Sequence, residues 1–181
     1  MKNNKALYWF VAKAAGMFIL WQVVYYLWLA PHTSIESWVT DVTATASTAM
    51  LRTLGYEADH YNHIKDASGN LFSTITINNK DQLNIGDGCN ALTLVILFAG
   101  FIIAYPGNRW YKLLFIVVGS LAIFSINLVR CLLLIFNYLF FEASFDFNHK
   151  YTFTIVTYLC VFYFWMLWAN RVSKLKPASS V

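Results

Sequence analysis

The chain has 181 residues, of which 59% are hydrophobic, 18% aromatic and only 12% charged, and its mean hydropathy is +0.51. Soluble globular domains carry about 25% charged residues, so this composition excludes an ordinary soluble protein and indicates an integral membrane protein. The net charge of +4 does not indicate nucleic-acid binding, because the excess cations lie in loops that belong to one side of a membrane.

Four apolar segments are long enough to cross a bilayer, which takes about 17 to 25 residues. They cover residues 7–30, 89–105, 113–141 and 150–169. We therefore predict an all-α multi-pass membrane protein with about four transmembrane helices. The third segment has 29 residues and would form a helix of roughly 43 Å, which exceeds a hydrocarbon core of about 30 Å. Part of it must tilt, break or protrude.

The first segment resembles a signal peptide in its basic start. However, its apolar body is too long, and Trp28 occupies the −3 position of the one plausible cleavage point, after Ala30. We interpret it as an uncleaved anchor.

Cations mark one side of the four segments. They lie before the first, between the second and third, and after the fourth: Lys2, Lys5, Arg109, Lys112, Arg171, Lys174 and Lys176. The positive-inside rule makes this side cytoplasmic and places both termini inside. Residues 31–88, with seven acidic and three basic residues and hence a balance of −4, then lie outside.

Residues 31–88 are predicted to form a small extracytoplasmic cap that begins with a helix. Thr33 and Glu36 have the spacing of a capping box. Apolar residues then recur at helical intervals from Ile35 until Gly55 ends the run. This pattern indicates one amphipathic helix.

The rest of the cap has the pattern of a hairpin. Residues 63–65 and 71–77 flank a turn-rich segment, and residues 82–85 form a further alternating stretch. The predicted organisation is an anchor (1–30), the cap (31–88), a core of membrane helices (89–170) and a cytoplasmic tail (171–181).

Cys89, Arg130 and His149 each lie near one edge of a different apolar segment. Counted from the opposite ends of those segments, they are 16, 17 and 20 residues away, or roughly 24, 26 and 30 Å at about 1.5 Å per residue. All three are therefore predicted at the outer interface of the membrane.

These residue types suit a thiol active site. A Cys89 thiolate would be the nucleophile, His149 a general base and then acid, and Arg130 a donor to an oxyanion. Asn127, one helical turn before Arg130, is predicted to fix the guanidinium or to bind the scissile amide. An ionisable group inside a span is costly, which favours a functional role.

Each residue also has an ordinary interpretation. Cys89 can be a small hydrophobe, Arg130 can extend to lipid headgroups, and His149 can be a solvated loop residue. Cys131 and Cys160 lie inside spans and are interpreted as packing residues, so no disulfide framework is expected.

Two other classes of protein stay open. One is a non-enzymatic membrane assembly partner or transporter subunit. The other is a metal-dependent enzyme built on His60 and His63, an H-x-x-H pair that lacks a catalytic glutamate. We expect neither a metal nor a cofactor.

Three short motifs occur in order: residues 83–92 (LNIGDGCNAL), residues 127–130 (NLVR) and Asn148-His149 before the last span. Together, over about residues 69–170, the chain resembles the exosortase/archaeosortase family of multi-pass membrane cysteine transpeptidases. It departs from that family at Asn90-Ala91, where Ser-Gly is common. Its compact form is similar to the short subgroup in Bacteroidetes-type bacteria.

The resemblance implies that Cys89 attacks a peptide bond in the C-terminal sorting signal of an exported protein, a motif followed by a transmembrane helix and a basic tail. Arg130 would stabilise the transition state and His149 would move protons, with Asn127 and Asn90 in support. The acyl-enzyme would pass to an acceptor amine or to water. The expected place is the outer face of the bacterial cytoplasmic (inner) membrane, with the lipid bilayer and exported substrates as partners, no nucleic acid and no cofactor.

Overall fold

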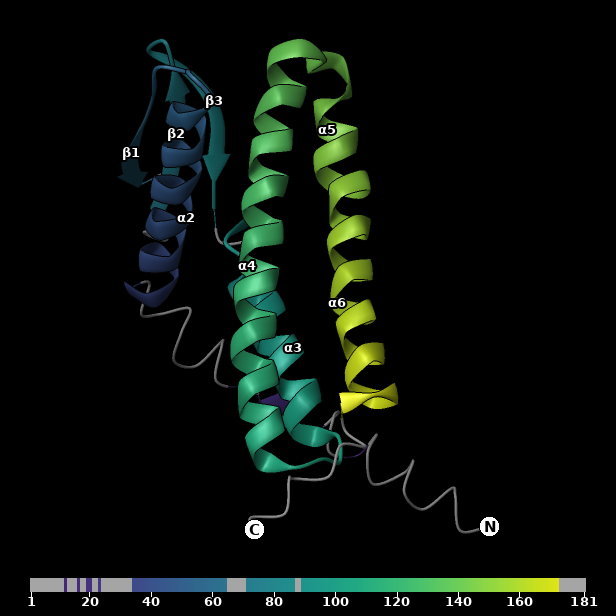
Figure 1. Cartoon of the computed structure of the whole chain (residues 1–181). Helices are drawn as coiled ribbons and strands as arrows, with labels where there is room; N and C mark the ends of the chain where they lie inside the picture. The colour runs from purple at the N-terminus through teal and green to yellow at the C-terminus, as the bar shows by residue number, and fades with distance from the viewer. Residues whose placement is uncertain are drawn as a thin grey trace.

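The computed structural model describes residues 34–64, 71–86 and 89–172, together with the isolated helical residues 12, 16, 19, 20 and 23. Within these ranges the chain forms two parts that lie side by side, a cap of one helix and a small sheet and a bundle of apolar helices (Figure 1). Most of the predicted anchor (1–30) and of the tail (171–181) lies outside the described residues.

The cap begins with helix α2 (Ser34–Thr53), where the apolar periodicity predicted a helix; its extracytoplasmic placement stays a prediction. The helix stops just before Gly55, whose φ of +89° lies in the left-handed region that favours glycine. One side of α2 is lined by small buried side chains, among them Thr40, Ala44 and Ser47. Small residues let the helix approach the sheet closely.

The sheet has three antiparallel strands in the order β1 (Ala58–Ile64), β2 (Leu71–Ile77) and β3 (Lys80–Ile85). The predicted hairpin is present, but β1 begins five residues earlier than the pattern indicated, at 58 rather than 63. Its sequence ADHYNHI is mostly polar, so apolar alternation could not reveal it. The cap is therefore not purely helical, and the described part of the chain is mostly α rather than all α.

The β2–β3 turn has positive φ at both Asn78 (51°) and Asn79 (59°), the conformation that a two-residue hairpin turn requires. This turn sets a register in which alternate apolar residues of both strands face inward. The resulting core joins the sheet to α2 and to the next long helix, with these members: Ala44, Leu51, Ala58, Ile75, Ile77, Leu83, Ile85, Cys131, Leu132, Leu134 and Ile135.

The bundle begins with α3 (Leu92–Ala104), a helix of 13 residues. It is shorter than the predicted segment 89–105, and at about 1.5 Å per residue it rises only roughly 20 Å, less than a bilayer core. Figure 1 shows α3 beside the lower half of the long helix that follows it. The first residues of the predicted span form a turn instead of helix.

Helix α4 (Arg109–Phe140) has 32 residues and is unbroken. Of the three outcomes expected for the long third segment, protrusion fits best, because Cys131, Leu132, Leu134 and Ile135 pack in the core of the cap. The lower part of α4 packs instead on α3, and Gly119 permits this because a Cβ there would overlap the ring of Phe98.

After α4 the chain turns back through a short 3-10 turn (Glu142–Ser144), α5 (Phe145–Phe147) and a π-helical turn (Asn148–Thr152) into α6 (Phe153–Asn170). Among the described residues, two helical stretches are long and apolar enough to cross a membrane, Arg109–Phe140 and Glu142–Asn170. The count of four crossings stays a prediction.

Candidate active site

Cys89 and His149 come together although they lie sixty positions apart in the chain. The Sγ of Cys89 is 3.4 Å from Nε2 of His149. His149 is not in a loop, as expected from the sequence, but in the π-helical turn before α6, a distortion that is frequent at functional sites. A thiol and an imidazole at this distance have the geometry of an activated nucleophile and its base.

One contact holds the His149 ring and another holds its backbone. The ring of Phe145 stacks on His149 with a centroid distance of 5.7 Å and an interplanar angle of 9°. The hydroxyl of Thr154 donates to the His149 carbonyl at 3.1 Å. Phe145 belongs to α5 and Thr154 to the beginning of α6, so the segments on both sides of the π-helical turn hold His149.

The turn that carries Cys89 is fixed by its backbone. The Cys89 N–H donates to the Gly86 carbonyl at 2.8 Å, and the amide of the buried Asn127 donates to the Cys89 carbonyl at 2.7 Å. A Cβ at Gly86 would meet the ring of Phe72, so the close turn requires glycine there. Gly88 lies outside the described residues.

Asn127 does not make the contact with the Arg130 guanidinium that was one of its two predicted roles; the other role, binding the scissile amide, stays a prediction. Its amide binds the Cys89 backbone and not the Arg130 guanidinium. The one-turn spacing to Arg130 suggested the wrong partner, because the Cys89 turn reaches α4 only through the tertiary fold.

Asn90, expected as a supporting residue, anchors the beginning of α3 to the cap. Its buried side-chain amide donates to Oγ1 of Thr40 at 3.2 Å and lies 3.5 Å from the carbonyl of Glu36. Its Oδ1 accepts from the N–H of Leu92 at 3.0 Å. The next residue, Ala91, has a φ of +63°, and it stands where the resembling family commonly has glycine.

All three predicted catalytic residues line one pocket of about 510 Å³. The sequence predicted a shared depth for them, and the structure adds lateral proximity. Among the described residues, the lining consists of Cys89, Arg130, Asp146, His149, Lys150 and Thr154. Sequence reasoning missed Asp146, Lys150 and Thr154, whose one signal was their closeness to His149 along the chain.

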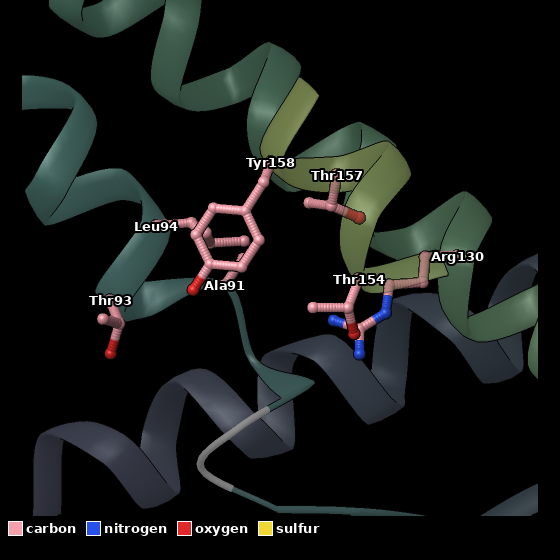
Figure 2. Close-up of a pocket in the computed structure, with 7 residues that line it drawn as sticks. All are labelled: Ala91, Thr93, Leu94, Arg130, Thr154, Thr157 and Tyr158. Carbon is pink, nitrogen blue, oxygen red and sulfur yellow. The ribbon is translucent and has the colours of Figure 1, made fainter. Parts of the chain in front are cut away.

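Arg130 also lines a second pocket of about 210 Å³, between the beginning of α3 and the beginning of α6. Figure 2 shows its guanidinium beside Thr154, with Tyr158 extending from α6 and Leu94 coming from α3. The Nε of Arg130 is buried and has no hydrogen-bond partner within the described part of the chain. A cationic donor therefore stands between the two pockets with capacity for a ligand.

Burial raises the pKa of the Cys89 thiol, while the positive charge of Arg130 and a hydrogen bond with the Gly86 backbone oppose this rise. Burial is the largest of the three causes, so the net effect on the pKa favours the thiol over the thiolate. The proton must then leave during the attack, and the adjacent imidazole is the group positioned to take it.

Of the alternative metal site, the structure describes the side chain of His60 but not that of His63. His60 Nε2 lies 3.3 Å from Oγ1 of Thr45 and 3.6 Å from a carboxylate oxygen of Asp41, both on α2. In the described ranges, no group of three or more His, Cys, Asp or Glu side chains lies close enough together to hold a metal ion.

The fold and the pocket together define a helical membrane protein with a thiol–imidazole pair at a turn between its cap and its bundle. Residues 5–167 match the protein family described as transmembrane exosortase, so the chain belongs to this family. The match confirms the resemblance drawn from the motifs around Cys89, Arg130 and His149. Searches of curated proteins and of solved structures each found no significant match. Membership of the short Bacteroidetes-type subgroup stays a prediction.

Proposed function

We propose that this protein is a membrane cysteine peptidase or transpeptidase that cleaves C-terminal sorting signals of exported proteins through a Cys89 acyl-enzyme. The observation that carries the proposal is the 3.4 Å approach of Cys89 Sγ to His149 Nε2 in a pocket that also contains Arg130. Membership of the transmembrane exosortase family supports the same reaction class.

The first half of the reaction forms a thioester. Nε2 of His149 takes the thiol proton as Sγ of Cys89 attacks the scissile carbonyl carbon, and the carbonyl electron pair moves onto oxygen. Arg130 donates to this oxyanion, an interaction that is strong in a site of low dielectric. When the intermediate collapses, the C–N bond breaks and the leaving amine takes the proton from the imidazolium.

The second half releases the product. An acceptor amine or water attacks the thioester carbonyl and gives a proton to His149. The C–S bond then breaks, and the sulfur recovers the proton from the imidazolium. A thiol, an imidazole and a guanidinium suffice for both halves.

The two adjoining pockets suit a substrate that enters from lipid. The pocket in Figure 2 lies between α3 and α6, and it shares Arg130 and Thr154 with the Cys89 pocket. The apolar side chains of α6 nearby are exposed, among them Ile155, Tyr158 and Leu159. A transmembrane helix that follows the scissile bond could lie along this side of α6 while its outer end occupies the smaller pocket.

The site is proposed to face the outside of the bacterial cytoplasmic membrane. The distribution of cations supports both termini inside. The cap, whose acidic residues outnumber its basic ones, would then be extracytoplasmic and would shelter the scissile bond at the interface.

The decisive variant is Cys89→Ala. We expect it to insert in the membrane at the wild-type level but to lose processing of an exported protein with a C-terminal motif, helix and basic tail. Cys160→Ala, in α6 and outside both pockets, is the matched control and should retain processing. Mass spectrometry should find a peptide linked to Cys89 in the wild type. Normal processing by Cys89→Ala would refute the proposal and favour a non-enzymatic membrane protein.

A further inference from the structure

A third cleft, of about 340 Å³, opens beside β3. It is lined by Asp81, Gln82, Leu83, Asn84, Tyr138, Phe145 and His149. The first four are consecutive residues of one strand. Successive side chains of a strand point to opposite faces, and here Leu83 is buried in the core while Asn84 is exposed. A cleft lined by residues of both faces runs along the edge of the strand.

This edge of β3 has no strand partner in the described part of the chain. The strand order is β1-β2-β3, so β3 pairs with β2 on one side, and its other side is turned toward α4 (Figure 1). A helix cannot continue a ladder of strand hydrogen bonds. The free edge of a strand presents a row of unpaired N–H and C=O groups that can pair with an added strand.

A second observation concerns a bulge in the same strand, β3. The sheet has an irregularity opposite Ile75 and Thr76, which pair with Leu83 and Asp81 and leave Gln82 as the extra residue of β3. Oε1 of Gln82 is buried and has no hydrogen-bond partner within the described residues. A bulge of this kind commonly redirects a side chain next to a functional site, and here the bulged residue, Gln82, lines the cleft.

The cleft is continuous with the candidate active site. His149 lines both the cleft and the Cys89 pocket, and Phe145, which stacks on the His149 ring, forms part of the cleft wall. Strand β3 ends at Ile85, only four positions before Cys89, so it runs toward the nucleophile. A polypeptide that pairs with β3 and ends at Cys89 must run in the same direction as β3.

We propose that the free edge of β3 binds the extended peptide segment that precedes the scissile bond, as an added parallel strand. This inference rests on the proposed function and specifies how its substrate is held. The four lining residues of β3 span roughly 13 Å at about 3.3 Å per residue, which accommodates about four substrate residues. Since the contacts are to backbone groups, the recognition tolerates many side chains in that segment.

The probes are N-acetylated alanine peptides of one to five residues that end in a chloromethyl ketone. The Cys89 sulfur displaces chloride to form a thioether, His149 takes the thiol proton, and no knowledge of the natural signal is needed. We expect the second-order rate of Cys89 alkylation in the full-length detergent-solubilised protein to rise about tenfold up to four residues and then to level off. Mass spectrometry assigns the modified cysteine.

Strand pairing has a specific signature in N-methylated probes. In an added strand, every second amide faces its partner strand. Methylating those amides should lower the rate by about tenfold, while methylating the amides in between should have little effect. An equal effect at every position would overturn the proposal, because it would indicate apolar contact rather than a ladder.

A variant of the opposite wall tests the location. Tyr138→Ala should reduce the ratio of the four-residue to the one-residue rate, whereas Tyr151→Ala, an exposed tyrosine outside the cleft, should keep it. A ratio that is unchanged in Tyr138→Ala would also contradict the proposal.

Iodoacetamide separates this inference from the proposed function. If iodoacetamide alkylates Cys89 faster in the wild type than in His149→Gln but the peptide rate does not depend on length, the edge proposal fails and the thiol site stands. If Cys89 reacts with neither reagent, or if His149→Gln reacts as fast as the wild type, the proposed function itself fails.

Discussion

The environment of the Cys89 sulfur decides how the site can work. Burial raises its pKa, and Arg130 is the largest influence that lowers it. A cation stabilises a thiolate, so removing the cation must move the pKa further up. The rate at which the Cys89 thiol reacts should therefore change when the Arg130 guanidinium is removed.

We expect Arg130→Ala to shift the pH dependence of Cys89 alkylation by iodoacetamide to higher pH. The rate of alkylation follows the thiolate fraction, so at neutral pH the variant should react more slowly than the wild type. The measurement is the rate constant against pH, with alkylation at Cys89 confirmed by mass spectrometry.

Two further variants test whether the shift in pH dependence comes from the charge of Arg130. Arg171→Ala, at the other end of α6, should leave the profile unchanged. Arg130→Lys should keep the profile near that of the wild type, because the charge is retained, but should process substrate poorly, because a point charge cannot reproduce a planar fork of donors. An unshifted profile in Arg130→Ala would mean that the guanidinium does not act on the sulfur.

Ala91, two residues after Cys89, has an unfavourable backbone conformation. Its φ of +63° lies in the left-handed region, which costs an L-residue about 1–2 kcal/mol. Ala91→Gly should therefore be at least as stable as the wild type, although it loses a buried methyl group. Ala91→Val should be destabilised by about 2 kcal/mol or more, since β-branched residues fit this region worst. Thermal unfolding in detergent measures both, and equal midpoints for the two variants would contradict the assigned backbone conformation.

At the residue scale, the sequence predicted the three chemical groups better than their surroundings. Cys89, Arg130 and His149 could be selected because polar groups are costly near the bilayer and so are conspicuous. The hydrogen bond from Asn127 to the Cys89 carbonyl and the position of Asp146 in the pocket lining were not predictable. Both depend on which turn approaches α4.

At the scale of elements, the close packing of α3 on α4 sets the height of the Cys89 turn. Gly119 is one point of close contact, where a Cβ would overlap the ring of Phe98. Because the turn at residues 89–91 directly precedes α3, pushing α3 away from α4 would also move the sulfur.

Gly119→Ala should destabilise the protein by about 1–3 kcal/mol through overpacking, although alanine favours a helix over glycine by about 1 kcal/mol. Replacing the ring by a smaller side chain in Phe98→Leu should restore space, so the double variant should be more stable than the sum of the two single changes predicts. The measurement is the unfolding midpoint of the wild type, the two single variants and the double variant, which together form a double-mutant cycle. Strict additivity would show that the two residues are not in contact.

The π-helical turn at Asn148–Thr152 is the element that the sequence described least well. Apolar composition predicted a span beginning at 150, and His149 was expected in a loop. The turn instead joins α5 to α6 and places the His149 ring between Cys89 and Phe145. Side-chain periodicity cannot distinguish one wide turn from the helix that continues it.

At the scale of the whole molecule, the cap and the bundle are joined by the upper part of α4. Its residues Cys131, Leu132, Leu134 and Ile135 belong to the core of the sheet and α2. The same helix supplies Arg130, which directly precedes Cys131, and Asn127, about one turn earlier. The candidate active-site pocket thus lies at the junction of the two parts, because Arg130 of α4 lines it.

This arrangement predicts a topology that labelling can test. In a Cys89→Ala/Cys160→Ser background, Asn79→Cys at the exposed β2–β3 turn should react with a membrane-impermeant maleimide in intact cells. Pro106→Cys, in the exposed loop between α3 and α4, should react only after the membrane is permeabilised. Labelling of both positions from outside, or of Pro106→Cys alone, would contradict the proposed orientation.

The sequence by itself indicated a membrane protein, showed which segments are apolar, and predicted a common depth for three polar residues. Composition and spacing along a helix axis carry that information, because burial in lipid and the rise per residue are local properties. Only the tertiary structure decided that Cys89 and His149 touch, that α3 is short, that α4 continues into the cap, and that β3 has an edge facing the site. These depend on contacts between segments far apart in the chain, which no local pattern specifies.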